Sequence, residues 1–208
     1  MVTTLYLTRH GETKWNVEKR MQGWKDSPLT EKGRQDAMRL GKRLEAVELA
    51  AIYTSTSGRA LETAELVRGG RLIPIYQDER LCEIHLGDWE GKTHDEIRQM
   101  DPVAFDYFWK TPHLYAPERG ERFCDVQQRA LETVRRIVER HEGETVLIVT
   151  HGVVLKTLMA AFKDTPLAHL WSPPYMYGTS VTIVEVNGGT FHVVVEGDVS
   201  HIEEVREV

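Results

Sequence analysis

Short apolar runs alternate with longer amphipathic segments along the chain, and this alternation predicts its elements. The runs 4–8 (TLYLT) and 50–55 (AAIYTS) are apolar and β-prone, and 144–152 (ETVLIVTHG) is the clearest buried strand. The run 71–77 contains a proline, which favours an edge strand or the start of a strand. Segment 179–197 is typical of a β-hairpin, with Asn-Gly-Gly at its turn.

Segments with helical periodicity lie between these strands. Thr30 is a suitable N-cap for a helix within 27–47, although Gly33 and Gly41 lower its helical propensity. Further helices are predicted over 57–67, 124–141 and 153–162.

The order of these elements predicts the fold class. Strands that alternate with helices indicate an α/β fold, in which helices flank a mostly parallel central sheet. The hairpin near the end of the chain adds antiparallel strands. Segment 92–124 breaks the alternation, and we expect it to form a small helical cap inserted into a single domain that spans residues 1–208.

Composition narrows the class of protein. A chain of 208 residues with 41% hydrophobic and 28% charged residues is typical of a globular domain, and its net charge of −6 does not favour nucleic-acid binding. No signal peptide is evident, and no apolar run is long enough to span a membrane. Cys82 and Cys124 have no metal-type or redox-type spacing. We therefore expect a cytoplasmic protein, either a monomer or a small homo-oligomer.

Two predicted strands end in the same way. Residues 5–11 (LYLTRHG) and 146–152 (VLIVTHG) each consist of an apolar strand, a threonine and then His-Gly. In an open α/β sheet, ligands bind beyond the carboxyl ends of the strands, near the point where the strand order reverses. We therefore expect His10 and His151 to meet in one crevice, with Arg9 beside them.

Two further residues fit this crevice. Arg59 follows the second predicted strand at the start of a helix, where an arginine and backbone amides can bind an anion. Glu83 lies between apolar residues, and such surroundings raise the pKa of a carboxyl group. Two histidines, two arginines and a carboxylic acid match the needs of phosphoryl transfer through a covalent intermediate, without a metal ion or other cofactor.

Five stretches in a fixed order resemble the histidine phosphatase superfamily, the phosphoglycerate mutase-like group. They are TRHGETKWN, RMQGWKDSPLTEKGRQDA, SGRALETA, EIHLGDWEG and VTHG, and they run from about residue 5 to residue 155. The tripeptide Arg-His-Gly is weak evidence by itself, but the ordered set is specific. The cap segment is the part least like the family.

The resemblance implies a role for each catalytic candidate. His10 matches the nucleophile that becomes phosphorylated, and Arg9 and Arg59 match the arginines of the phosphate pocket. His151 matches the second histidine, which holds phosphate oxygens. Glu83 matches the proton donor.

The resemblance also implies pocket residues around the loop after the first strand. Asn16, Gln22 and Gly23 match positions that line the pocket in relatives, whereas Arg20 fits a structural salt bridge equally well. Many relatives have Gly-Glu-Ser before the long helix, but this chain has Arg122 in place of the serine. Arg122 therefore either changes the capping of that helix or points toward the site.

Aromatic residues are concentrated in the predicted cap. A helix as short as 101–109 cannot bury aromatic residues on every side, so at least one of them is expected to face the crevice. We expect Tyr107 and Trp109 to do so, opposite Met21. An apolar wall of this kind would favour large or hydrophobic alcohols as leaving groups.

These features favour a broad-specificity phosphomonoesterase with small-molecule substrates. A phosphoglycerate mutase is a second interpretation, disfavoured because the stretch after Glu90 lacks the arginine pair that mutases of this family carry. A specific metabolic phosphatase, such as an α-ribazole phosphatase, remains open. A phosphate-binding module without activity is a third interpretation, although such a module has no use for a proton donor.

Overall fold

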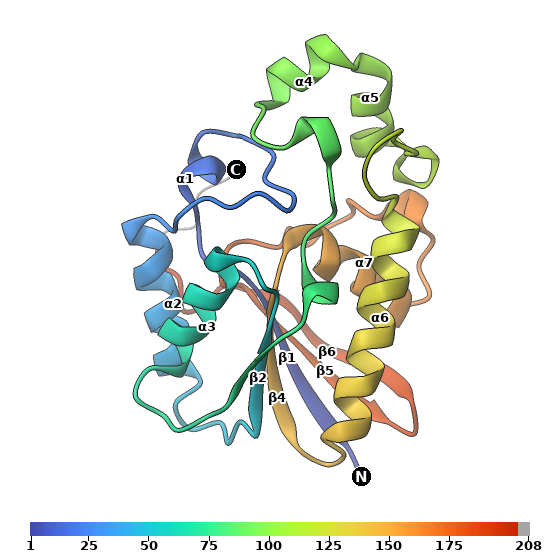
Figure 1. Cartoon of the computed structure of the whole chain (residues 1–208). Coiled ribbons are helices and arrows are strands. Elements are labelled where there is room, and N and C mark those ends of the chain that lie inside the picture. Colours follow the sequence, from blue (N-terminus) through green and yellow to red (C-terminus); the bar gives the residue numbers. More distant parts are fainter. Residues whose placement is uncertain (204–208) are drawn as a thin grey trace.

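One six-stranded mixed sheet forms the centre of the computed structural model, which describes residues 1–203 (Figure 1). The strands are β1 (Thr3–Arg9), β2 (Ala51–Thr54), β3 (Ile75–Gln77), β4 (Thr145–Thr150), β5 (Val181–Asn187) and β6 (Thr190–Asp198). Their order across the sheet is β3-β2-β4-β1-β5-β6. The first four pair in parallel, whereas β5 is antiparallel to both β1 and β6. The predicted α/β fold with a C-terminal antiparallel hairpin is confirmed.

The predicted helices are present, with ends within a few residues of expectation. The helices are α1 (Lys14–Val17), α2 (Glu31–Arg43), α3 (Gly58–Arg68), α4 (His94–Met100), α5 (Pro102–Lys110), α6 (Phe123–Arg140) and α7 (Gly152–Phe162). Short 3₁₀ turns lie at Glu79–Leu81, Gly87–Trp89, Pro112–Leu114 and Leu167–His169. The four residues of α1 were not predicted, because one helical turn carries no periodicity to detect.

Helices cover both faces of the sheet (Figure 1). Leu5 and Leu7 of β1 lie in one apolar cluster with side chains of α6 and α7. On the opposite face, Leu147 and Val149 of β4 pack with side chains of α2 and α3. Full burial of a leucine or valine side chain contributes about 1.5–3 kcal/mol, so these two layers hold the central strands firmly.

The glycines of α2 serve packing rather than helix formation. A Cβ atom on Gly41 would lie only 2.7 Å from the carbonyl oxygen of Val67 in α3. A Cβ atom on Gly33 would overlap the backbone of Glu12, which follows β1. Close approach of these backbones therefore explains why α2 contains residues that lower its intrinsic propensity.

The register of the two central strands places the predicted histidines together. β1 and β4 are parallel neighbours, with Arg9 opposite Thr150, so His10 and His151 each follow the end of their strand at the same level. After β1 the chain continues to α2 on one face, and after β4 it continues into α7 on the other face. This divergence is the topological switch point at which α/β sheets bind ligands.

Helices α4 and α5 lie above the carboxyl ends of the strands (Figure 1). Their aromatic side chains pack against residues outside the cap: the ring centroids of Trp109 and Trp171 are 5.0 Å apart, and Trp171 Nε1 donates a hydrogen bond of 2.6 Å to the Phe108 carbonyl. Such packed aromatic pairs add about 0.5–1.5 kcal/mol each beyond the burial of their area. The cap is thus fixed to the main body by apolar contacts.

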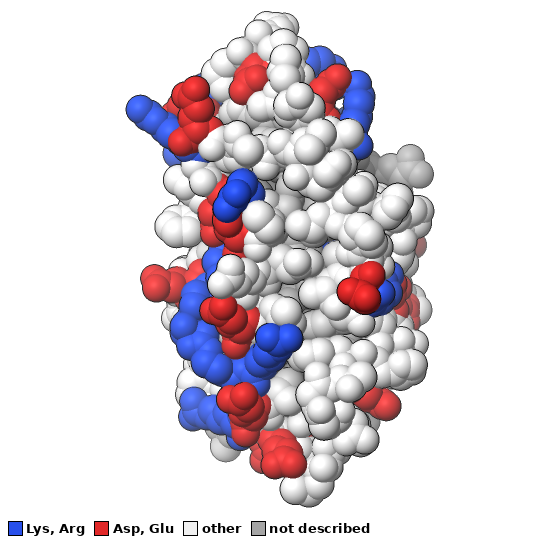
Figure 2. Space-filling model, turned by 90° about the vertical axis from the view of Figure 1, so that its right-hand side faces the viewer, with Lys and Arg blue, Asp and Glu red and all other residues white. Residues whose placement is uncertain are grey.

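Acidic and basic side chains lie next to one another down one edge of the face shown in Figure 2. The described side chains on this face form rows of mixed sign rather than an extended basic surface. None of the helices within residues 1–203 combines the length and the apolar character needed to cross a membrane.

Candidate active site

His10 directly follows β1, and its hydrogen bonds define its protonation. Nδ1 lies 2.8 Å from the carbonyl oxygen of Gly11, which can only accept, so Nδ1 carries the proton. Nε2 therefore carries the lone pair, which accepts a hydrogen bond from Arg59 Nε at 3.3 Å. Burial, together with the guanidinium groups of Arg59 and Arg9, holds the pKa of His10 well below 6.5. His10 is a neutral imidazole with a nucleophilic nitrogen at the edge of a cavity.

Arg59 lies at the start of α3 and contacts both the loop after α1 and the two histidines. Its side chain is only 1% exposed. It pairs with Asp26 at 2.9 Å and donates to two carbonyl groups in the loop 23–25. Its remaining contacts are to the histidines, with Nη2 lying 3.2 Å from Nδ1 of His151. One buried cation thus bridges both histidines and places positive charge between them.

His151 is fully buried behind Arg59 and is not among the residues that line the cavity. Its ring centroid lies 5.2 Å from that of His10. Burial and the nearby Arg59 charge hold the pKa of His151 well below 6.5, so this ring is also neutral. Nε2 of His151 lies 2.7 Å from Ser55 Oγ at the end of β2.

Arg9 and Gln22 each have a buried polar atom without a hydrogen-bond partner in the described part of the chain. Arg9 Nη1 donates to Tyr175 Oη at 3.2 Å and to the Met176 carbonyl at 3.0 Å, whereas its buried Nε has no partner among the described residues. The buried Oε1 of Gln22 also lacks one. Both residues line the cavity. Because a buried polar atom without a partner costs about 1–3 kcal/mol, these atoms mark a place for a polar ligand.

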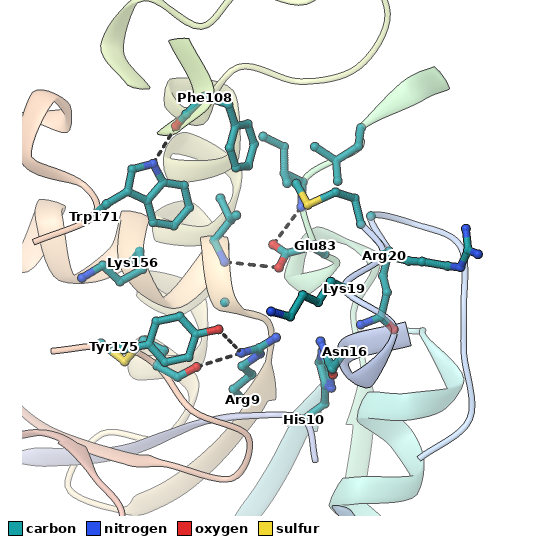
Figure 3. Close-up of a pocket in the computed structure, with 18 of the residues that line it drawn as sticks. Arg9, His10, Asn16, Lys19, Arg20, Glu83, Phe108, Lys156, Trp171 and Tyr175 are labelled. Carbon is teal, nitrogen blue, oxygen red and sulfur yellow. Dashed lines mark hydrogen bonds between the residues drawn. The ribbon is translucent and has the colours of Figure 1, made fainter. Parts of the chain in front are cut away.

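Glu83 enters the cavity from the loop after β3 (Figure 3). Its two carboxyl oxygens accept hydrogen bonds from the backbone N–H groups of Ile84 at 3.0 Å and of Val153, in the first turn of α7, at 3.2 Å. The Glu83 carbonyl accepts from Arg129 of α6 at 3.0 Å, which holds the loop in place. These contacts hold the Glu83 carboxyl group in the cavity that Arg9 and Arg59 also line.

The cavity has a volume of about 380 Å³ and two chemically different sides (Figure 3). One side presents His10, Arg9, Arg59 and Glu83. The other is mainly apolar, with the side chains of Met21, Ile84, Leu86, Phe108, Trp109, Val153, Trp171, Pro173, Pro174 and Met176. The site can therefore hold a phosphoryl group at one end and an apolar group at the other.

Most of the predicted pocket residues line this cavity. They are Asn16, Met21, Gln22, Gly23 and Trp109. The prediction for Tyr107 is not supported, because its side chain is 41% exposed on α5 and outside the cavity lining, where its helix neighbour Phe108 takes the inward position instead.

Two arginines left open by the sequence now have defined contacts. Arg20 pairs with Glu18 and Glu96 and donates to the Gly91 carbonyl, while part of it lines the cavity. Arg122 is the N-cap of α6, where its backbone N–H and its guanidinium both donate to the Asp125 carboxylate, and it does not line the cavity. The missing serine therefore changes helix capping only.

Sequence reasoning missed one wall of the cavity and two lysines. Trp171, Tyr175 and Met176 come from the loop after α7, far along the chain from every motif. Lys156 of α7 lines the cavity and donates to the carbonyls of this loop, and Lys19 follows α1. No motif signals these positions, since their contribution depends on where the loops meet.

Comparison with known proteins agrees with this geometry. The chain is similar to the solved structure of Bacillus stearothermophilus YhfR, with 92% identity, a TM-score of 0.96, and coverage of 97% of this chain and 100% of that one. It is 34% identical to phosphoglycerate mutase-like protein 4 of Arabidopsis thaliana, over 96% of this chain and 87% of that protein. It is 31% identical to the metal-independent phosphoserine phosphatase of Arabidopsis thaliana, over 98% and 85%.

The sequence profile of the histidine phosphatase superfamily (branch 1) matches residues 5–199, nearly the whole chain. The names of these relatives include a mutase-like protein and a phosphatase. They agree on an enzyme of phosphoryl transfer but leave its substrate open. The chain belongs to the histidine phosphatase superfamily, branch 1, and is an enzyme of that family.

Proposed function

We propose that this enzyme hydrolyses phosphomonoesters through a phosphohistidine at His10, with broad specificity and a preference for apolar leaving groups. The observation that carries the proposal is the state of His10. Its Nδ1–H is engaged by Gly11, which leaves a nucleophilic Nε2 at the wall of a cavity whose far side is apolar.

In the first step, His10 Nε2 forms a bond to phosphorus while the bond from phosphorus to the alcohol oxygen breaks. Arg9 and Arg59 neutralise the negative charge of the phosphoryl oxygens. N–H donors in such a buried site stabilise that charge more strongly than donors in water do. Glu83 gives its proton to the departing oxygen. The alcohol leaves, and the phosphoryl group remains on His10.

In the second step, water takes the place of the alcohol. Glu83, now a carboxylate, accepts a proton from this water as its oxygen attacks phosphorus. The bond between phosphorus and Nε2 breaks, and inorganic phosphate and neutral His10 are regenerated. Two arginines supply the positive charge that the transferred group needs, so the scheme requires no metal ion.

The apolar side of the cavity supports the preference for apolar alcohols. Phe108, Trp109 and Trp171 provide aromatic surface there, and burial against it contributes about 25 cal/mol per Å². A compact acid such as 3-phosphoglycerate covers little of this surface. We expect kcat/KM for aryl or long alkyl phosphates to exceed that for 3-phosphoglycerate about tenfold or more, or about 1.4 kcal/mol.

A substrate panel in the presence of EDTA distinguishes the possible activities. The panel contains aryl and alkyl phosphates, α-ribazole phosphate, and 3-phosphoglycerate with its bisphosphate. Hydrolysis of many esters with apolar groups supports the proposal. Fast interconversion of phosphoglycerates without phosphate release would establish a mutase, and hydrolysis of one ester alone would establish a specific phosphatase.

Trapping tests the covalent intermediate directly. Brief reaction with a labelled phosphomonoester, followed by an alkaline quench, should leave acid-labile label on His10. His10→Ala should lose turnover by several powers of ten, because it removes the nucleophile. Substantial turnover in His10→Ala would overturn the mechanism.

A further inference from the structure

Lys19 is a cation at the cavity that the mechanism above does not use. Its side chain lines the cavity and extends into it from the segment after α1 (Figure 3). Within residues 1–203 its ammonium group makes neither a hydrogen bond nor an ion pair, whereas the adjacent Arg20 is paired with Glu18 and Glu96. Lys19 therefore supplies a positive charge that no described side chain neutralises.

The backbone of Lys19 adopts a conformation that lysine disfavours. Its φ angle is +53°, in the left-handed region that glycine and asparagine adopt more readily than other residues. The neighbouring chain imposes this angle, since Lys19 N–H donates to the Asn16 carbonyl and the Lys19 carbonyl accepts from His94 N–H. A side chain without a structural partner at a strained position suggests a role in binding.

The position of Lys19 defines what it can bind. Lys19 is exposed and yet lines the cavity, so it lies where the cavity opens to solvent. The phosphoryl group belongs with Arg9 and Arg59, and the apolar part of a substrate belongs against Phe108 and Trp171. An anion near Lys19 would therefore be carried by the part of the leaving group that lies away from its ester oxygen.

We propose that Lys19 is a specificity-determining residue that binds a second anionic group on the substrate. The substrate class is then phosphomonoesters of aromatic or long-chain alcohols that carry a distal carboxylate. This inference rests on the proposed hydrolase function and restricts its substrate class. It is compatible with poor use of 3-phosphoglycerate, whose carboxylate is not separated from the phosphate by an apolar body.

A matched pair of esters tests the proposal. Carboxyphenyl phosphate and carbamoylphenyl phosphate have nearly the same shape, but only the first carries a second anion. We define the anion preference as the ratio of their kcat/KM values, measured for the meta and for the para isomers. In Lys19→Met this ratio should fall about fivefold or more for at least one isomer, and in Lys19→Arg it should be largely retained.

Two controls separate binding from folding. Lys14→Met removes a lysine from α1 that lies outside the cavity lining, and it should leave the anion preference unchanged. Lys19→Asn removes the charge but suits the positive φ angle, so it should lose the anion preference with a Tm equal to or above that of the wild type. The wild-type preference should also weaken with added NaCl, because salt screens an exposed ion pair.

The outcomes of this test are distinguishable from failure of the proposed function. If His10→Ala is inactive but Lys19→Met and Lys19→Asn keep the wild-type anion preference for both isomers, the role of Lys19 is wrong and the hydrolase function stands. If His10→Ala retains turnover, the proposed function itself fails.

Discussion

Ser55 Oγ lies 2.7 Å from Nε2 of His151, and neither side chain is exposed. The guanidinium of Arg59 can only donate, so Nδ1 of His151 is the acceptor of its hydrogen bond. Nε2 must then carry the proton of the neutral ring and donate it to Ser55. The Ser55 hydroxyl group is thus the nearest acceptor for this proton and helps to hold Nδ1 of His151 toward Arg59.

Ser55→Ala should lower both stability and turnover, because it leaves a buried N–H without its acceptor. The cost of such a group is about 1–3 kcal/mol in the free energy of unfolding. We expect kcat to fall about tenfold as the His151 ring loses its orientation. Ser57 Oγ is 3.5 Å from the same nitrogen, so Ser57→Ala is the matched control and should have a much smaller effect. Equal effects of the two substitutions would contradict this role for Ser55.

Glu83→Gln should slow the hydrolysis of esters with poor leaving groups more than that of esters with good ones. An alkoxide needs a proton as it departs, whereas p-nitrophenolate hardly does. We expect the loss in kcat to be about 100-fold for an alkyl phosphate and about tenfold at most for p-nitrophenyl phosphate. Equal losses would move the acid role to another residue. Glu12 is the first to test, although its carboxylate accepts from Thr30 at 2.7 Å and does not line the cavity.

Trp171→Ala and Trp109→Ala should reduce the preference for apolar leaving groups. Both side chains line the cavity, and their removal exposes the bound alcohol to water. We expect the ratio of kcat/KM for aryl phosphates to that for 3-phosphoglycerate to fall about fivefold or more. Tyr107→Ala, on the same helix as Trp109 but outside the cavity, should keep the wild-type ratio. A ratio unaffected by both tryptophan changes would refute the apolar pocket.

The two buried histidines make stability depend on pH. Their pKa values are held well below 6.5 in the folded protein, while an unfolded chain binds protons near pH 6.5. Below about pH 6.5 the two histidines therefore bind more protons in the unfolded state than in the folded state. Their contribution to the free energy of unfolding is complete above about pH 6.5 and is lost as the pH decreases below it. Each histidine adds up to about 1.4 kcal/mol per pH unit to this slope.

Urea unfolding between pH 5 and 8 in a phosphate-free buffer measures this effect. His10→Gln removes one of the two groups, so its stability should fall less steeply with decreasing pH, by up to about 1.4 kcal/mol per unit. The same slope in wild type and variant would show that the pKa of His10 is not lowered in the folded protein.

The sequence by itself determined the order of elements and brought forward the candidate catalytic residues. Apolar periodicity gave the long helices and the central strands, because burial of one face constrains which residues can occupy it. The position of His10 and His151 directly after two such strands was enough to bring them together, since parallel neighbours end at the same edge of the sheet.

Only the tertiary structure decided which side chains from loops distant in the sequence line the cavity. Trp171 and Tyr175 reach the site because the ammonium group of Lys156 donates to two backbone carbonyls of their loop. No periodic pattern in the sequence predicts such a contact. Phe108 rather than Tyr107 faces the cavity, because the angle at which α5 packs on the body selects one side of a short helix. That Lys19 has no ion-pair partner within residues 1–203 depends on which acidic groups lie within its reach, and three-dimensional packing sets those distances.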